Sequence, residues 1–214
     1  MEIQTQILKI APQIIELGKI KIIAEILRRE GIIAYPTDTF YGLGANCFSK
    51  DAIQRIYQLK GRKLSKPLSV VVSDIEMMRE VVIDIPPVFW QITDKFWPGP
   101  LTIILKASAK FPADLLGTGA SIGIRLPDLP WLRKLVSETG IPITATSANI
   151  SGEREVSHIE EVRETFYGKV DLIVDGGKTR GNLPSTVIDM TSESPKVLRE
   201  GAIPRSQLKN HLGK

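Results

Sequence analysis

Residues 31–66 read GIIAYPTDTFYGLGANCFSKDAIQRIYQLKGRKLSK, and the organisation of the chain can be worked out from this stretch. Residues 32–34 are a short apolar run with the length and branching of a buried strand. The run breaks at residues 36–39, Pro-Thr-Asp-Thr, and two glycines follow. Ser49 is then a candidate N-cap for a short amphipathic helix that ends at Gly61.

The far end of this helix is strongly basic. Four cations fall within seven residues: Lys60, Arg62, Lys63 and Lys66. Hydroxyl groups at a strand end, a flexible backbone at the two glycines and a cluster of positive charge suit an anionic ligand that also carries hydroxyl groups. The alternative is an ordinary strand, turn and helix with a solvated basic end. This stretch alone does not separate the two.

Composition describes an ordinary globular chain of 214 residues, 43% hydrophobic and 24% charged. No apolar run approaches the roughly 20 residues that span a bilayer, and the first residues lack the pattern of a signal peptide. The single cysteine, Cys47, excludes an internal disulfide and fits a reducing compartment, so we expect a cytoplasmic protein without a membrane partner. The formal net charge of +4 allows an anionic partner without requiring one.

Several kinds of site are excluded by the same inventory. Two histidines, His158 and His211, and one cysteine are too few for a zinc or iron site or a His-based triad, and we interpret both histidines as surface residues. Residues 176–179 end like a phosphate-binding loop, but Leu172 stands where its first glycine belongs. Cys47 stands where the third glycine of the dinucleotide-type motif belongs. No Asp/Glu cluster could hold a metal alone, so Mg²⁺ would arrive with the phosphates of ATP.

Apolar periodicity predicts alternating helices and strands along the rest of the chain. Helices are expected at 12–30, 50–60, 73–82, 87–96, 129–139 and 158–166, with a terminal helix from Pro204. Strands are expected at 5–10, 32–35, 68–72, 101–105, 122–127, 141–146, 170–174, 185–190 and 196–199. Because the last strands follow one another without a helix, we expect a single α/β domain with a twisted mixed sheet flanked by helices. Its core would cover about residues 20–203, followed by a basic tail, 204–214, that frays.

Small hydroxyl residues stand at several predicted strand ends, where ligands of sheet proteins gather. They are Thr37 and Thr39; Thr144, Thr146 and Ser147, with Asn149; and Ser185 and Thr186. Each could instead be a simple turn former. Arg125 is a sharper candidate, because it lies within an apolar run and a buried guanidinium needs an anionic partner. That partner could be a structural carboxylate or the carboxylate of a substrate.

An ordered set of motifs resembles the YrdC family of L-threonylcarbamoyladenylate synthases. The resemblance covers about residues 20–203, and its signature is Lys-x-Arg at residues 60–62 together with Ser-x-Asn at residues 147–149. The other matching segments are residues 35–44, 97–102, 123–127, 150–152, 185–188 and 198–201.

The resemblance implies that L-threonine, bicarbonate and ATP react to give threonylcarbamoyl-AMP and pyrophosphate, the first step toward N6-threonylcarbamoyladenosine at position 37 of tRNA. It also implies a deep, positively charged cavity. Position by position, it assigns threonine to Thr39, Arg125 and Ser185. It assigns ATP or the adenylate to Lys60, Arg62, Lys66, Ser121, Ser147, Asn149 and Arg199, with Lys60 and Arg62 as catalytic residues. The product would pass to a tRNA or to a downstream threonylcarbamoyl-transferase.

The residues fit this chemistry. Threonine, bicarbonate and a triphosphate are all anionic, and clustered cations relieve their repulsion. Positioning and charge neutralisation can supply most of the acceleration, so no protein nucleophile is required. Residues 151–155 are a candidate lid on flexibility alone.

Two positions depart from the family pattern. Lys63 stands where many members have proline, and Val71 stands where many have a histidine near threonine, so we expect no threonine contact from that strand. Some relatives also carry a second C-terminal domain, which we do not expect here.

Two other functions compete with the synthase reading. One is an RNA-binding or ribosome-assembly module that uses the basic concave surface. The other is a carbamoyl-transfer module of a larger enzyme. The chain is only mildly basic and has 6% aromatic residues, which disfavours RNA binding by stacking.

Overall fold

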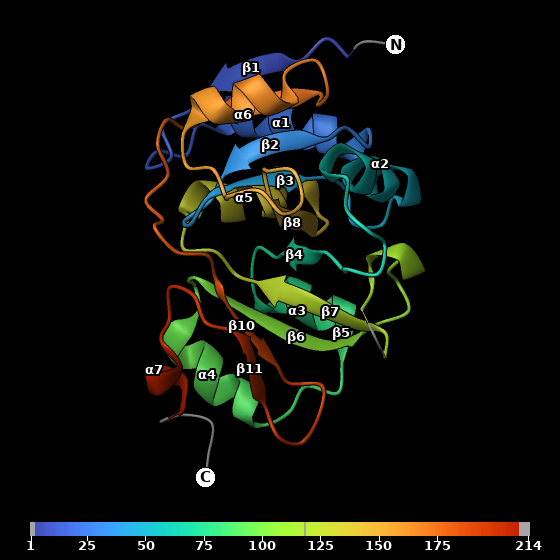
Figure 1. Ribbon diagram of the computed structural model, residues 1–214, viewed down its shortest axis with the longest axis vertical. Helices are drawn as coiled ribbons and strands as arrows, with labels where there is room; N and C mark the ends of the chain where they lie inside the picture. The colour runs from blue at the N-terminus through green and yellow to red at the C-terminus, as the bar shows by residue number, and fades with distance from the viewer. Residues whose placement is uncertain (1–2, 118, 210–214) are drawn as a thin grey trace.

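The computed structural model describes residues 3–117 and 119–209, and its centre is a twisted mixed sheet (Figure 1). The strands are β1 (Gln6–Lys9), β2 (Ile33–Pro36), β3 (Tyr41–Gly44), β4 (Ser69–Val71), β5 (Val82–Ile83), β6 (Leu101–Ala107), β7 (Ser121–Arg125), β8 (Ile143–Ser147), β9 (Leu172–Asp175), β10 (Thr186–Asp189) and β11 (Lys196–Arg199). The helices are α1 (Leu17–Arg28), α2 (Lys50–Lys60), α3 (Ile75–Val81), α4 (Val88–Phe96), α5 (Pro130–Thr139), α6 (Ile159–Phe166) and α7 (Arg205–Lys209), with a 3-10 turn at Ala113–Leu115.

The strand order is β1-β9-β2-β3-β8-β4-β7-β6-β10-β11, with β5 paired to β6. Some neighbours are parallel, such as β1 with β9 and β6 with β10, and others are antiparallel, such as β2 with β3 and β6 with β7. The expected mixed α/β fold is therefore confirmed. Figure 1 shows β2, β3 and β8 stacked on one side of β4, with β7 and β6 on the other. Segments far apart in the sequence meet at this middle region.

The core has two parts. In the smaller part, α1 and α5 pack together against β2 and β9 through buried side chains that include Ile23, Leu27, Leu132 and Val136. The larger part packs α2, α4 and α6 through residues that include Ile53, Phe89 and Phe166. Within residues 3–117 and 119–209, no helix has the length and apolar character needed to cross a membrane.

Local signals for α2 were read correctly. The Ser49 hydroxyl accepts a hydrogen bond from the Ala52 amide at 3.2 Å, which caps the first turn. Gly61 ends the helix in the left-handed conformation with φ of 56°, which glycine adopts without strain.

The predicted start of the first helix was wrong. The helix begins at Leu17 and not at Pro12, because residues 11–16 form turns in which the side chain of Glu16 accepts a hydrogen bond from the Ala11 amide. Ile14 and Ile15 therefore point to solvent, with 61% and 46% of their surface exposed. Their apolar character mimicked a helical face that the chain does not form.

The glycines that follow residues 36–39 do not form a flexible segment. Gly42 and Gly44 belong to β3, which is buried between β2 and β8. A Cβ atom at Gly44 would lie 2.7 Å from the ring of Tyr35 on the neighbouring strand. Glycine is needed at this position because any side chain would collide with Tyr35. The order of residues along the chain does not indicate this contact between neighbouring strands.

The prediction for the basic tail was also partly wrong. Residues Arg205–Lys209 form α7, as the terminal-helix signal at Pro204 indicated, and Leu208 is fully buried. That buried contact holds this part of the tail against the domain. The rest of the tail, including His211, lies outside the described residues. His158 is exposed at the start of α6, as expected.

Candidate functional site

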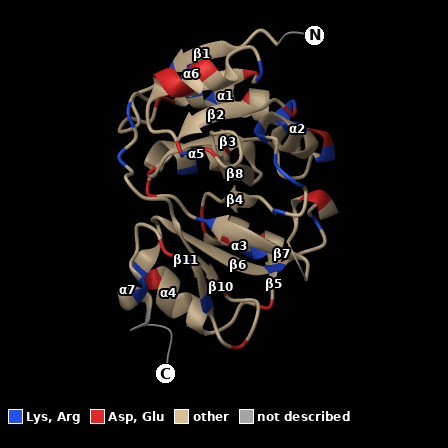
Figure 2. Cartoon of the chain, viewed as in Figure 1, with Lys and Arg blue, Asp and Glu red and all other residues tan. Residues whose placement is uncertain are grey.

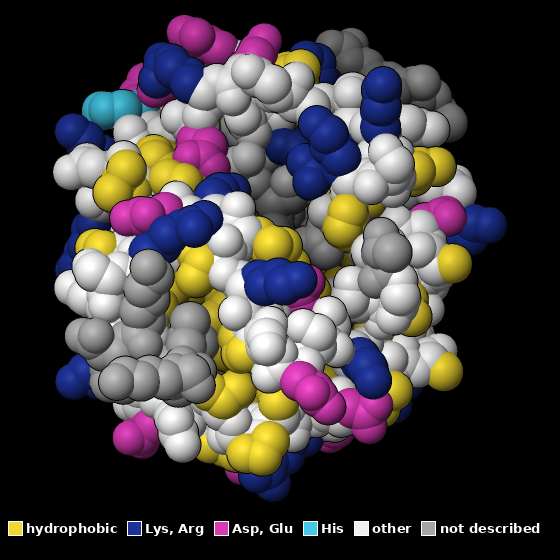
Figure 3. Space-filling view, turned by 60° about the horizontal axis from the view of Figure 1, so that its bottom comes forward, with side chains coloured by type: hydrophobic (Ala, Val, Ile, Leu, Met, Phe, Trp, Pro, Cys, Tyr) yellow, Lys and Arg dark blue, Asp and Glu magenta, His cyan; other side chains and the backbone are white. Residues whose placement is uncertain are grey.

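A cavity of about 490 Å³ lies where the two halves of the sheet meet. This volume is in the range of small-molecule sites. Eight of the residues predicted to bind substrates line it: Thr39, Arg62, Lys66, Ser121, Arg125, Ser147, Ser185 and Arg199. In Figure 3, Lys and Arg side chains surround a hollow near the middle of the face shown. The structure thus brings together residues that lie up to 160 positions apart (from 39 to 199).

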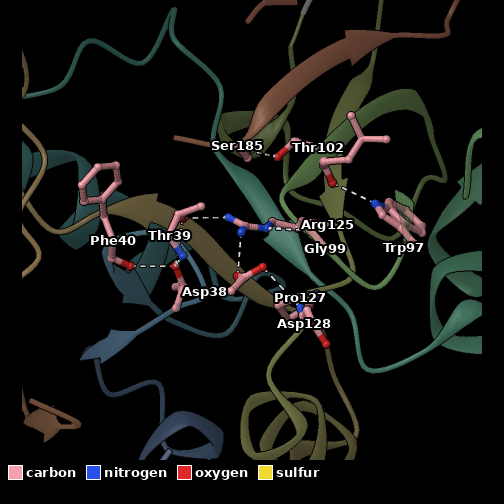
Figure 4. Close-up of polar contacts among 12 residues, drawn as sticks. Asp38, Thr39, Phe40, Trp97, Gly99, Thr102, Arg125, Pro127, Asp128 and Ser185 are labelled. Atoms are coloured by element: carbon pink, nitrogen blue, oxygen red, sulfur yellow. Dashed lines mark hydrogen bonds and ion pairs between the residues drawn. The ribbon is translucent and has the colours of Figure 1, made fainter. Parts of the chain in front are cut away.

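Arg125 is held at the wall of this cavity by three contacts (Figure 4). Its Nη2 atom lies 2.6 Å from Oδ1 of Asp38, and its Nη1 atom donates to the hydroxyl of Thr39 at 3.1 Å. Its Nε atom donates to the carbonyl of Gly99 at 3.3 Å. The expected burial of Arg125 is confirmed, and its anionic partner within the protein is a structural carboxylate.

Ser185 is joined to the same wall through Thr102. The two hydroxyl groups lie 2.9 Å apart, and Thr102 pairs with Arg125 across β6 and β7. Arg199 donates from Nε and Nη2 to the carbonyl of Ser185, at 3.1 and 2.9 Å. Thr39, Arg125, Ser185 and Arg199 therefore belong to one network that faces the cavity.

Lys60 does not line the cavity. Its ammonium group donates to the carbonyl of Asn149 at 2.7 Å, to the side-chain oxygen of Asn149 at 3.0 Å and to the carbonyl of Ser147. Only 1% of the residue is exposed, and burial lowers the pKa of the ammonium to about 8, an effect to which the nearby Arg62 guanidinium adds. An ammonium with three acceptors has its donors fully used. The geometry therefore does not support direct contact between Lys60 and a nucleotide.

Asn149 is likewise occupied within the protein. Its side-chain oxygen accepts from the hydroxyl of Ser147 at 2.6 Å, and its amide nitrogen donates to the carbonyl of Glu153 at 2.7 Å. The Lys-x-Arg and Ser-x-Asn motifs are thus linked by contacts that fix the segment after β8. Ser147 lines the cavity, whereas Asn149 lies behind it.

The basic loop from α2 to β4 is folded on itself, and Figure 2 shows its cations along this connection. Arg62 donates from Nε to the carbonyl of Lys66 and from Nη2 to the carbonyl of Pro67, each at 3.0 Å. Burial lowers the pKa of Arg62 below its ordinary value. Lys63 is exposed and does not line the cavity, while its carbonyl accepts from the Lys66 amide at 3.0 Å. A proline at position 63, which many family members have, would also offer this carbonyl. The lysine found here therefore keeps the same hydrogen bond to the Lys66 amide.

Val71 also lies away from the cavity. It is 1% exposed and belongs to the smaller part of the core, with residues of α1 and α5, whereas Ser69 of the same strand lines the cavity. The side chain at position 71 therefore does not line the cavity, but Ser69 keeps β4 at the cavity wall, so the expectation that this strand makes no threonine contact stays a prediction.

Asp38 and Glu155 were missed as site residues. Asp38 stood in the central stretch, but only the three-dimensional contact with Arg125 shows its role. Glu155 lies in the segment proposed as a lid and lines the cavity. Burial raises the pKa of its carboxyl group, while the positive charges of Arg199 and Lys60 act in the opposite direction. No sequence pattern marked it, because it lies in an irregular polar loop.

The segment 151–155 is anchored at both ends. The Ser151 amide donates to the carbonyl of Lys60 at 2.8 Å, and the Tyr41 amide donates to the carbonyl of Val156 at 2.9 Å. A lid role for this segment stays a prediction.

The described residues contain no group of three or more His, Cys, Asp or Glu side chains that could hold a metal ion. Glu155 is the single carboxylate among the described residues of the cavity wall. This donor set fits Mg²⁺ only as an ion whose other ligands come from phosphates and water.

Comparison with known proteins relates this arrangement to one family. The Sua5/YciO/YrdC family model, described as "Telomere recombination", matches residues 25–201. The chain is 38% identical over 199 residues to the threonylcarbamoyl-AMP synthase of Pyrococcus abyssi, covering 93% of this chain and 58% of that protein. It is 31% identical over 181 residues to the threonylcarbamoyl-AMP synthase of Vibrio vulnificus, covering 84% of this chain and 96% of that protein.

Solved structures show the same likeness. The structure of P. abyssi Sua5 complexed with L-threonine matches with a TM-score of 0.93 at 37% identity, covering 98% of this chain and 61% of that one. The chain therefore spans less than two thirds of the Pyrococcus protein and nearly all of the Vibrio protein.

Proposed function

The chain belongs to the Sua5/YciO/YrdC family, and on that premise we propose that it makes threonylcarbamoyl-AMP and pyrophosphate from L-threonine, bicarbonate and ATP. One observation carries the proposal. A single cavity is lined both by the network of Thr39, Arg125 and Ser185 and by the cations Arg62 and Lys66. This arrangement supports a site that takes an amino acid and a polyphosphate together.

The amino acid would bind at Arg125. A guanidinium has five N–H groups, and three are used by Gly99, Thr39 and Asp38. The other two can donate to the carboxylate of threonine. The hydroxyl groups of Thr39 and Ser185 lie in the same network and can donate to or accept from the polar groups of the substrate.

The nucleotide would bind where Arg62, Lys66, Ser121, Ser147 and Arg199 line the cavity. Cations there offset the negative charge of the triphosphate in a partly enclosed site, where their effect is larger than in water. Mg²⁺ would arrive with the triphosphate and neutralise part of its charge. We assign Lys60 and Asn149 to support of this wall, because their polar groups are used within the protein.

The reaction depends on the positioning of the substrates and needs no nucleophilic group from the protein. The amine of threonine adds to the carbon of bicarbonate with loss of water, which forms a carbamate. A carbamate oxygen then attacks the α-phosphorus of ATP, and the bond to the β-phosphate breaks to release pyrophosphate. Reactants held in line and screened from water react faster without a protein nucleophile.

The product of the reaction needs a recipient, because threonylcarbamoyl-AMP is an activated intermediate. The product would pass to a tRNA or to a downstream threonylcarbamoyl-transferase in the cytoplasm. An RNA-binding module remains the alternative, but the cations that line a cavity beside Arg125 favour a small anionic ligand over an extended one.

The direct test is to incubate the purified protein with L-threonine, bicarbonate and ATP labelled in the γ-phosphate. We expect labelled pyrophosphate only when all three substrates are present, because the attacking group is a carbamate made from two of them. Omitting each substrate in turn provides the control. Pyrophosphate release that ignores threonine would contradict the proposal.

A second experiment concerns the basic loop. Arg62→Ala is expected to lower turnover by about 10³-fold, the effect of removing a cation that stabilises charge during transfer at phosphorus. Its two hydrogen bonds go to carbonyls of its own exposed loop, so the loss of about 1 kcal/mol should lower the melting temperature by only about 2–4 °C. Steady-state rates and thermal unfolding measure both quantities.

Lys63→Ala is the matched control, because Lys63 is a cation of the same loop that does not line the cavity. It should keep nearly wild-type turnover. If Arg62→Ala unfolds at a much lower temperature, or if Lys63→Ala loses as much activity, Arg62 has a structural role instead.

A further inference from the structure

Asp38 forms a nearly buried ion pair that the substrate assignments do not use. The Asp38 and Arg125 side chains are 10% and 9% exposed, and their charged atoms are 2.6 Å apart. Unlike Thr37, Thr39 and Phe40, which flank it, Asp38 does not line the cavity. It therefore contacts Arg125 from behind the cavity wall.

Both carboxylate oxygens of Asp38 have partners. Oδ1 accepts from Nη2 of Arg125, and Oδ2 accepts from the amide of Asp128 at 3.3 Å (Figure 4). Asp128 follows β7, the strand that ends at Arg125. Asp38 thus ties the loop after β2 to the loop after β7, so the carboxylate has little freedom to turn toward a ligand.

The guanidinium plane is fixed by these contacts. Nε, Nη1 and Nη2 each have one partner, and the three partners come from separate segments at Gly99, Thr39 and Asp38. Three donors held in different directions leave a planar group one orientation. The two remaining N–H groups are thereby aimed without any contribution from the ligand, which lowers the entropy cost of binding.

Asp38 also changes the charge of this part of the cavity. The described lining residues include four cations, Arg62, Lys66, Arg125 and Arg199, and one carboxylate, Glu155. Among the cations, Arg125 is the one with a carboxylate within ion-pair distance in the described structure. Asp38 therefore offsets the charge of Arg125 directly, while Arg62 and Lys66, which have no carboxylate partner among the described ion pairs, keep more of their field for phosphates.

We infer that Asp38 is a positioning residue that orients Arg125 and cancels its charge, so that this part of the cavity takes a zwitterionic amino acid in preference to phosphate. The inference rests on the proposed function, since it concerns the proposed threonine site. It adds the reason why threonine and the phosphates of ATP would not compete for one arginine.

The test replaces Asp38 by asparagine, which keeps the shape and removes the charge. L-threonine and ATP binding are measured by calorimetry, and inorganic phosphate is the competing anion. In Asp38→Asn we expect threonine affinity to fall by at least about tenfold with ATP affinity within about twofold, and phosphate to compete with threonine. Asp94→Asn, the same change at an exposed position of α4, is the control and should bind both as wild type does.

A measurement without substrate tests the orientation separately. Nitrogen NMR of the Arg125 Nη atoms, assigned by loss of the signals in Arg125→Lys, should show two distinct resonances in the wild type, because hydrogen bonds restrict rotation of the guanidinium. In Asp38→Asn they should merge. Unchanged Nη signals, or unchanged threonine affinity without phosphate competition, would overturn the inference.

If Asp38→Asn fails to fold, competition between phosphate and threonine for the wild-type protein still tests the inference. Phosphate that displaces threonine from the wild type would also overturn the inference, whereas threonine binding that resists phosphate supports it. A wild type that binds no threonine would refute the proposed function. Where Asp38→Asn folds, the Nη signals of the two proteins would still decide the role of Asp38 in that case.

Discussion

Replacing Arg125 by glutamine is expected to lower the affinity for L-threonine by at least about 100-fold while changing the affinity for ATP by less than about threefold. Two charge-assisted hydrogen bonds to a carboxylate, at about 1.5–3 kcal/mol each, account for a loss of that size. Arg125 carries them because two of its N–H groups have no partner among the described contacts. Calorimetric titration with each substrate measures the two affinities.

The single substitution has a cost that must be separated from binding. It leaves the carboxylate of Asp38 nearly buried without its cation, a change typically worth about 3–5 kcal/mol of stability. The double variant Arg125→Gln with Asp38→Asn removes both charges and should recover much of that stability, yet still fail to bind threonine. Equal loss of threonine and ATP binding in a well-folded double variant would refute the assignment of Arg125 to the amino acid.

Replacing Lys60 by methionine should lower the stability of the protein strongly. The ammonium donates to three oxygen acceptors in a buried setting, and its removal takes one hydrogen bond from each of them, although the side-chain oxygen of Asn149 keeps the hydroxyl of Ser147 as a donor. We expect the free energy of unfolding to fall by about 3 kcal/mol, which corresponds to a melting temperature lower by about 6–12 °C for a chain of this size. Turnover should also fall, because the segment that holds Ser147 at the cavity loses its tether.

Lys66→Met is the matched control for this experiment. Lys66 is an exposed cation at the cavity wall, so its loss should reduce turnover with little change in melting temperature. If Lys60→Met instead melts like the wild type and loses only ATP binding, Lys60 contacts the nucleotide directly, as the family resemblance implies, and the structural role is wrong.

Much of the fold could be predicted from local patterns. The cap residues of α2, the apolar runs of the strands and the absence of helices between the last strands all indicated the α/β class correctly. The wrong predictions arose where the local pattern of residue types did not indicate burial or packing. Ile14 and Ile15 continued an apolar period although they are exposed, and the glycines of β3 resembled a flexible turn although they make room for Tyr35.

The residues of the candidate site could also be predicted only in part. The motifs identified most of the residues that line the cavity, because each is a short local pattern with a distinctive order along the chain. They could not show which members face the cavity. Lys60 and Asn149 belong to the signature and yet are used within the protein, while Asp38 and Glu155 carried no signal of their own.

The amino-acid sequence by itself determined the class of fold, the family and the kinds of chemistry that the chain can perform, since these follow from the order and spacing of residues. Only the tertiary structure decided which of these residues face the cavity and which support its wall through contacts within the protein. Lys60 meets Asn149 across 89 residues, and Arg125 meets Asp38 across 87, because the sheet places β2, β8 and β7 in an order that the sequence does not state. The central stretch that contains Thr39 becomes a wall of the cavity through those distant contacts, which decide where each buried charge finds its partner.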